Sequence, residues 1–346
     1  MNCKRGFVAI LGICIFLFPF VSVHAQQVSL SLSPPILEAV IKPGKSILIA
    51  YTVENSGDPL VLKPQVVSFV PQGNNGEMQL KQELSGPVRF QLDNSQIALE
   101  EPFFLKSKDS QQLLLRIRIP EGTPEGDYYY SLLVQSEPPP TTEGIGSTRA
   151  TVKIGSPILL TVTRTGMLDL KGKITTFDVI PRLSFSLFGT KIQIVDSNDT
   201  IPAILTIYNQ GKNAIKPQGT LNLRGNFGEK ISYDVEPVNI LAESERLVTA
   251  TPSADIDCDT IPKKGLCNNQ YSLLLQGFFI GLYTLSTTIN FGEGSPLITA
   301  NTNFIALPLR LLVALIIVIG IALLLLVKLK DRKTKPKDQT DSVTEE

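Results

Sequence analysis

Residues 49–57 read IAYTVENSG, and residues 204–211 read ILTIYNQG. Each stretch is rich in β-branched and aromatic residues and ends in an Asn-x-Gly turn signal. Each is followed by Lys-Pro-Gln, at residues 63–65 and at residues 216–218. The same strand, turn and strand in the same order predict an internal repeat of two β domains.

Much of the remaining chain has the same character. Residues 46–54 read SILIAYTVE, residues 113–119 read LLLRIRI and residues 128–135 read YYYSLLVQ. Short runs of this kind, separated by Gly and Pro, are typical of β-sandwiches. Because the repeated region is too long for one sandwich of about seven strands, we predict two tandem immunoglobulin-like β-sandwiches, at residues 26–165 and 166–305. The expected fold class is therefore all-β, with one C-terminal transmembrane helix.

A second match supports two domains. GDYYYSL at residues 126–132 is similar to GLYTLS at residues 281–286, and both stretches are placed to enter a late strand of a sandwich. We place the domain boundary near residue 165. PPPTTEGIGS at residues 138–147 is either an interdomain linker or a long hairpin loop. We favour the loop, because the strand-like residues 148–163 that follow would complete the first sandwich.

Three consecutive tyrosines, Tyr128, Tyr129 and Tyr130, lie in the first of these matched stretches. Alternation along a strand sends Tyr128 and Tyr130 to one face and Tyr129 to the other. In immunoglobulin-like domains a tyrosine at this corner bonds back to the backbone. We therefore favour a structural role for the cluster over the alternative, which is stacking on a ligand.

The C-terminal part of the chain is apolar. Residues 311–327, from Leu311 to Val327, read LLVALIIVIGIALLLLV, without a charge. A helix needs about 20 apolar residues to cross a bilayer, and an extension back to Ala306 supplies them. We predict a transmembrane helix at residues 306–327 in contact with membrane lipid, with a buried core helix as the alternative. Arg310 lies near its outer end, where the long side chain can reach the headgroups.

The charges that flank the two ends of the chain predict its orientation. A basic cluster marks the cytoplasmic side, so residues 328–346 form a cytoplasmic tail and the ectodomain lies outside a single-pass cell membrane. At the N-terminus, Lys4 and Arg5 precede an apolar stretch that ends in Val23-His24-Ala25, which predicts a signal peptide at residues 1–25. An uncleaved N-terminal anchor is the alternative. The basic residues of the tail are Lys328, Lys330, Arg332, Lys333, Lys335 and Lys337.

Composition excludes several kinds of chemistry. The chain has one histidine, His24, and no tryptophan. Because His24 lies in the predicted signal peptide, the mature chain lacks the usual general base and the commonest metal ligand. Only two cysteines remain after cleavage, which is too few for a zinc site of four Cys and His ligands within one chain. We expect no enzyme, no metal and no cofactor, and a hydrolase that uses paired carboxylates on cell-wall glycans is the alternative.

The net charge gives no sign of a polyanionic partner. The chain has 32 basic and 32 acidic residues, for a formal net charge of +0. Without the two basic residues of the signal peptide, Arg310, and the six basic and five acidic residues of the tail, the ectodomain has 23 basic and 27 acidic residues, a balance of −4. We expect no nucleic-acid binding.

The two remaining cysteines, Cys258 and Cys267, are close in sequence. In an oxidising compartment we expect them to form a disulfide within one loop, with two free thiols as the alternative. Asp255, Asp257 and Asp259 begin like a calcium loop, but the glycine and the glutamate of such a loop are missing. We favour a solvated acidic loop.

The first domain contains SPP at residues 33–35, KPGKS at 42–46, NSGD at 55–58, PEGTPEGDY at 120–128 and IGSPILL at 154–160. These stretches resemble the WxL-interacting cell-surface proteins of bacteria. The resemblance implies a signal peptide, two immunoglobulin-like domains, one C-terminal helix and a short basic tail. It also implies peptidoglycan binding through the first domain and host or partner binding through the second. No motif residue allows a binding site of that family to be assigned in this sequence.

From the sequence and this resemblance, we predict a membrane-anchored bacterial cell-surface protein for binding or scaffolding. Its expected partner is a cell-wall polymer or an envelope or surface protein, bound at a strand edge or a sandwich face. The first alternative is a chaperone-like assembly factor for secreted proteins. The second is the carboxylate-based glycan hydrolase.

Overall fold

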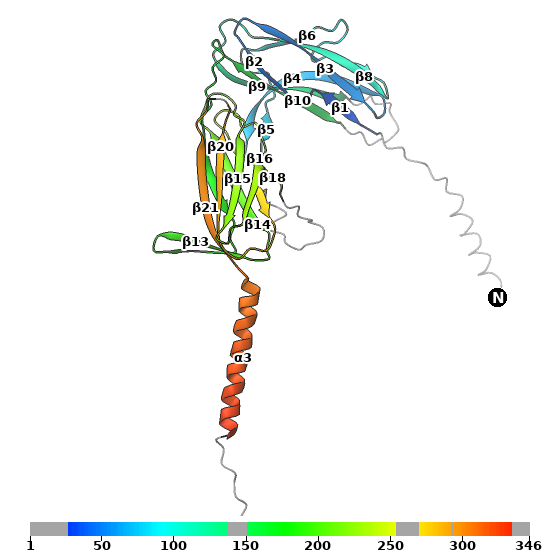
Figure 1. Cartoon of the computed structure of the whole chain (residues 1–346). Coiled ribbons are helices and arrows are strands. Elements are labelled where there is room, and N and C mark those ends of the chain that lie inside the picture. Colours follow the sequence, from blue (N-terminus) through cyan, green and yellow to red (C-terminus); the bar gives the residue numbers. More distant parts are fainter. Residues whose placement is uncertain (1–26, 138–150, 254–269, 293, 334–346) are drawn as a thin grey trace, which may run out of the picture. The chain divides into compact units, whose positions relative to one another are not determined.

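The computed structural model describes residues 27–137, 151–253, 270–292 and 294–333 (Figure 1). It is an all-β protein with a C-terminal helix, which confirms the predicted fold class. The predicted signal peptide, the segment at residues 138–147, Cys258, Cys267 and the three aspartates beside them lie outside the described residues. These expectations stay predictions.

The chain divides into two compact units. Unit 1 holds the described residues up to Phe69 together with Leu80–Arg164, and unit 2 holds Val70–Gln79 and the described residues from Thr165 onward. The sequence analysis assigned residues 70–79 to the first domain. Their contacts place them in unit 2, where the carbonyl of Asn74 accepts a hydrogen bond from the amide of Leu247 at 2.7 Å.

Unit 1 is a β-sandwich of two sheets around one core. Its first sheet has the order β1 (Leu30–Ser33), β3 (Ser46–Asn55), β8 (Asp109–Arg118) and β6 (Arg89–Leu92). Its second sheet has the order β2 (Leu37–Ile41), β10 (Lys153–Val162), β9 (Gly126–Glu137), β4 (Leu60–Gln72) and β5 (Glu77–Leu80), with β7 (Phe103–Leu105) also on β4. The end of β4 and most of β5 continue this sheet but belong to unit 2 by their contacts.

The core of unit 1 follows from alternation along its strands. In β8 the alternate residues Leu113, Leu115 and Ile117 are apolar and fully buried, because successive side chains of a strand point to opposite faces. Each such aliphatic side chain contributes about 1.5–3 kcal/mol by leaving water. The predicted strands at 46–54 and 128–135 lie within β3 and β9. The strand predicted at 113–119 is found in β8 up to Arg118, and the one predicted at 148–163 is found as Lys153–Val162 of β10. β9 and β10 pair antiparallel as neighbours in one sheet.

Unit 2 is a second sandwich around its own core. One sheet holds β11 (Gly172–Val179), β14 (Ile201–Asn209) and β17 (Glu245–Leu247), with β19 (Leu273–Leu275) also on β14. The other has the order β12 (Leu183–Leu187), β13 (Thr190–Asp196), β21 (Ile298–Leu307), β20 (Gly281–Asn290), β15 (Gln218–Gly225), β16 (Lys230–Val235) and β18 (Ala250–Thr251).

The repeated Asn-x-Gly motif has the same structure in both units. Asn55 ends β3 and Asn209 ends β14, and both are fully buried. Each side-chain oxygen accepts a hydrogen bond from the amide two residues on, that of Gly57 at 3.0 Å and that of Gly211 at 2.9 Å. Each side-chain amide donates to backbone carbonyls of a distant segment. The motif therefore closes an arch from one sheet to the other, since β3 and β4, like β14 and β15, belong to different sheets.

In each arch, the glycine lies against the backbone of the segment that leads into the first strand of the same sandwich. A Cβ atom on Gly57 would lie 2.3 Å from the carbonyl oxygen of Gln27, and one on Gly211 would lie 2.1 Å from that of Asp169. Only glycine permits so close an approach of two backbones. The requirement for glycine in the motif is thus steric.

Both sandwiches close in the same way. The leading part of each unit pairs antiparallel in one sheet, β1 with β3 and β11 with β14. The chain then changes sheets and pairs parallel with the last strand of the unit, β2 with β10 and β13 with β21. In each sandwich, the strand that follows the change of sheet is therefore hydrogen-bonded to the last strand.

The tyrosine cluster is structural, as predicted. The hydroxyl of Tyr128 donates to the carbonyl of Pro124 at 3.0 Å. Tyr130 is buried in the core, where burial raises its pKa to about 12. Tyr129 lies on the other face, stacked on Phe69 with ring centroids 5.8 Å apart.

The helix α3 (Leu309–Lys333) begins three residues later than the sequence analysis placed it. Ala306 and Leu307 belong to β21, where Ala306 pairs with Gly281 and is fully buried. Apolar residues occur both in a buried strand and in a membrane-spanning helix. The apolar run therefore does not show where the strand ends and the helix begins. Leu309–Leu326 is long and apolar enough to cross a membrane and is not buried by the sandwich.

We expect Asn209→Ala to lower the free energy of unfolding of unit 2 by about 2–4 kcal/mol, because it leaves several buried backbone groups without partners. Asn222, exposed on β15, provides the matched control, and Asn222→Ala should change stability by less than about 0.5 kcal/mol. Urea unfolding of the full chain in detergent, followed by circular dichroism, measures both. Equal losses for the two variants would contradict the role given to Asn209.

Candidate functional site

The junction between unit 2 and α3 is the first candidate site. β21 ends at Leu307, and α3 begins at Leu309, so Pro308 alone separates them. The amide of Leu312 donates to the carbonyl of Pro308 at 3.0 Å, which starts the helix directly after the strand. The sandwich and the apolar helix are thus joined without a linker.

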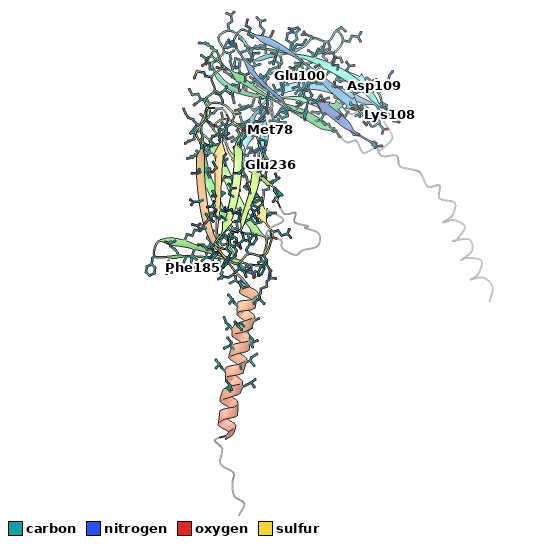
Figure 2. All side chains as sticks on the ribbon, in the orientation of Figure 1. Met78, Glu100, Lys108, Asp109, Phe185 and Glu236 are labelled. Carbon is teal, nitrogen blue, oxygen red and sulfur yellow. The ribbon has the colours of Figure 1, made fainter. Side chains whose placement is uncertain are left out.

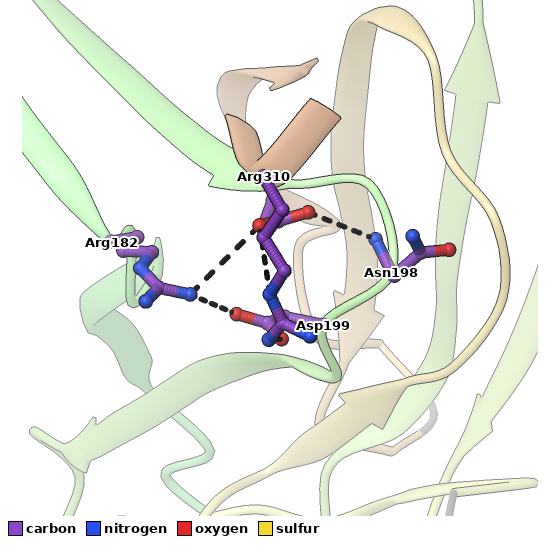
Figure 3. A network of polar contacts seen from close by, with 5 residues as sticks. Arg182, Asn198, Asp199 and Arg310 are labelled. Atoms are coloured by element: carbon purple, nitrogen blue, oxygen red, sulfur yellow. Dashed lines mark hydrogen bonds and ion pairs between the residues drawn. The ribbon is translucent and has the colours of Figure 1, made fainter. Parts of the chain in front are cut away.

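An ion-pair network holds this junction (Figure 3). Arg310, in the first turn of α3, donates to Asp199 at 2.8 Å, and Arg182 donates to the other oxygen of Asp199, also at 2.8 Å. The carboxylate of Asp196 is fully buried, with Arg310 at 3.6 Å and Arg182 at 3.9 Å. Two guanidinium groups therefore offset the charge of two carboxylates.

The short turn from β13 to β14 presents these carboxylates. The amide of Asp199 donates to the carbonyl of Asp196 at 3.1 Å, and the amide of Asn198 donates to the side chain of Asp196 at 3.4 Å. The amide of Ser197 donates to the carbonyl of Leu307 at 3.0 Å. The turn is thereby fixed to the last residue of β21, directly before the helix.

An open pocket of about 330 Å³ lies beside the network. Asp196 and Asp199 both line it, and two carboxylates in one cleft are part of what the hydrolase alternative requires. Both carboxylates are engaged by arginines, one of which belongs to α3. Their role in this structure is to hold the helix against the sandwich.

The second candidate site is a pocket of about 320 Å³ in unit 1, with a mainly polar lining. Asn94 fixes its wall, since its side chain donates to the carbonyl of Gln112 at 2.7 Å and accepts from the amide of Leu114 at 2.8 Å. Next to it, Arg116 donates to Asp93 at 3.0 Å and holds the pKa of that carboxyl below its usual range. The lining residues are Asn94, Ser95, Gln96, Ile97, Phe103, Phe104 and Gln111.

This second pocket combines amides with an exposed ring. Gln96 is exposed and Phe104 is 61% exposed. Amide side chains donate and accept hydrogen bonds, and an aromatic ring adds a flat apolar surface. A pocket with a few polar groups beside apolar surface is suited to a neutral polar ligand.

Sequence reasoning placed neither site. It noted Arg310 but assigned its side chain to the headgroups, whereas the structure pairs it with Asp196 and Asp199 of the sandwich. Among the described residues, no group of three or more His, Cys, Asp or Glu side chains is placed to hold a metal ion.

We expect the double variant Arg182→Gln with Arg310→Gln to destabilise unit 2 by about 3–5 kcal/mol, because Asp196 keeps a buried charge without a cation. Adding Asp196→Asn should restore most of this loss. Thermal unfolding of the full chain in detergent measures the three proteins.

Arg224 is exposed on β15 and serves as the matched control. Arg224→Gln should change stability by less than about 0.5 kcal/mol. If Asp196→Asn gave no recovery in the double variant, the charge balance described here would be wrong.

No family model matches the chain, and no curated protein matches it. Among solved structures, the chain is similar to the class 5 fimbriae chaperone CfaA, with 12% identity over 81% of this chain and 100% of that one, at a TM-score of 0.36. It is similar to the E. coli chaperone DraB, with 15% identity over 80% of this chain and 98% of that one, at a TM-score of 0.34. It is also similar to a PapD-like domain of human CEP192, with 14% identity over 39% of this chain and 84% of that one, at a TM-score of 0.26.

Proposed function

We propose that this chain is a membrane-anchored binding protein of the bacterial cell surface. α3 crosses the membrane, and the two sandwiches lie outside it. The observation that carries the proposal is the apolar, unburied stretch Leu309–Leu326, joined to a sandwich by one residue and held there by Arg310. A helix of this length spans about 27 Å, close to the hydrocarbon thickness of a bilayer.

The pocket of unit 1 is the proposed binding site. Its amides and the exposed ring of Phe104 suit a neutral, polar polymer such as the glycan of peptidoglycan. This assignment agrees with the resemblance to the WxL-interacting proteins, which implies wall binding through the first domain.

A chaperone-like assembly factor is the second candidate, and the edge strand β2 favours it. Among the described residues, β2 pairs with β10 on one side only. Ile36 and Val40 beside this edge are exposed, Val40 at 60%. An open edge with exposed apolar side chains can take an extended polypeptide as an added strand.

The orientation of the chain is tested with protease on intact cells, after the outer layers are made permeable. We expect both sandwiches to be digested and an epitope placed at Glu346 to survive until the membrane is broken, because the basic tail resists translocation. Loss of the epitope with survival of the sandwiches would invert the proposed topology.

Binding is tested by sedimenting the detergent-solubilised full chain with purified wall material. We expect Phe104→Ala to weaken binding about tenfold, as for the loss of one central aromatic contact. Leu48→Ala, which truncates an exposed side chain of β3, is the control and should bind as the parent chain does.

The same preparation distinguishes the chaperone. If the chain captured secreted polypeptides, and Val40→Lys abolished that capture while wall binding was absent, the edge of β2 and not the pocket would be the functional surface.

A further inference from the structure

The hairpin of β12 and β13 has its apolar face turned outward. Leu183 pairs with Ile194, and Phe185 pairs with Ile192, so these four apolar side chains share one face. Leu187 continues the face on β12, which is exposed along its whole length. Figure 2 shows Phe185 on this hairpin. An apolar sheet face normally packs onto a core, whereas this one faces solvent.

The polar face of the same hairpin is turned toward the sandwich. Gln193 is buried and donates to Asp178 of β11 at 2.6 Å, and Lys191 forms an ion pair with the same carboxylate. Thr302 of β21 also donates to Asp178, at 2.8 Å. Burial raises the pKa of Asp178, but these hydrogen bonds outweigh it and hold the pKa below its ordinary value. Specific polar contacts thus fix which face points away.

The turn of the hairpin exposes the ring of Phe188, although the backbone at this residue is in an unfavourable conformation. Phe188 and Gly189 form a two-residue loop, with φ of 49° and 79°. Loops of this kind favour Asn-Gly, and a non-glycine residue in the left-handed region is destabilised by about 1 kcal/mol or more. Phe188 is nonetheless 99% exposed. Neither packing within the chain nor turn preference accounts for phenylalanine at this position.

The base of the hairpin lies at the end of unit 2 from which α3 starts (Figure 1). In the parallel pairing, Asp196 is level with Leu307, and the helix begins two residues after Leu307. We call this the membrane-proximal end of unit 2. Its opposite end carries Asn209, which pairs with Gly172.

Two further loops reach the membrane-proximal end with exposed rings. Gly281 pairs with Ala306 and Leu282 with Ile305, so the loop before β20 lies there. The amide of Asn226 donates to the carbonyl of Leu282 at 3.1 Å, which brings the β15–β16 turn to the same end. Phe278 of the first loop is 60% exposed, and Phe227 of the turn is 72% exposed.

We propose that the membrane-proximal end of unit 2 docks onto the lipid surface of the bilayer that α3 spans, with the apolar face of the β12–β13 hairpin, Phe227 and Phe278 in the headgroup region. The inference rests on the proposed membrane anchoring. α3 leaves the sandwich at this same end, so the surface is continuous with the membrane-spanning segment. Aromatic side chains are enriched at this depth, and apolar faces with polar backs bind there.

The absence of tryptophan from the chain permits a direct test. Phe188→Trp supplies a single reporter in the full chain, reconstituted into phosphatidylcholine vesicles with or without lipids brominated near the headgroup end of the acyl chains. We expect blue-shifted emission that falls by about half with brominated lipid, because an interfacial side chain lies within about 5–10 Å of that level. Phe227→Trp, at a second exposed position, should behave in the same way.

Two control variants distinguish failure of the docking proposal from failure of the membrane anchoring. Met167→Trp places the reporter at an exposed position before β11, toward the opposite end of unit 2, and should be neither shifted nor quenched. Ile319→Trp reports on α3 and should be quenched by lipids brominated deep in the chains. If Ile319→Trp were not quenched, the membrane anchoring itself would fail.

Quenching of Ile319→Trp without quenching of Phe188→Trp and Phe227→Trp would overturn the docking proposal alone. Blue-shifted emission of Phe188→Trp without bromine quenching would also overturn it, since the ring would then be covered by protein, either a second copy or an added strand.

Discussion

A buried asparagine at the end of one strand is the interaction on which each sandwich depends. Asn55 and Asn209 bind backbone groups from separate segments of the chain, and each accepts from the glycine amide two residues on. An unsatisfied backbone group in this position costs about 1–3 kcal/mol. By satisfying several such groups at once, one amide side chain fixes the arch between the sheets. The glycine that follows lets the leading segment lie against that arch.

The strands and the repeat could be predicted because burial and turn geometry determine which residue types stand at which positions. Alternate burial on β8 produces the alternation of LLLRIRI, and the need for a small turn residue produces Asn-x-Gly. The start of α3 could not be predicted in this way, because Ala306 and Leu307 are apolar as strand residues of unit 2.

The ion-pair network at the junction could not be predicted, since it joins residues that are distant in sequence. Arg310 donates to Asp199, which lies 111 positions away in the sequence. A local sequence pattern does not predict such a pair. The hairpin shows a related limit of sequence patterns. Its alternation predicts two faces, but only the contacts of Gln193 and Lys191 with Asp178 decide which face turns inward.

The direct passage from β21 into α3 has a mechanical consequence. β21 is hydrogen-bonded on one side to β20 along most of its length, and at its end to β13 on the other side. A pull on unit 2 along the helix axis is therefore a pull along β21, and it loads many hydrogen bonds of these ladders in shear at the same time. Bonds that share a load resist it together, whereas bonds at the end of a hairpin open one by one. The strand that leads into α3 is thus suited to transmit tension.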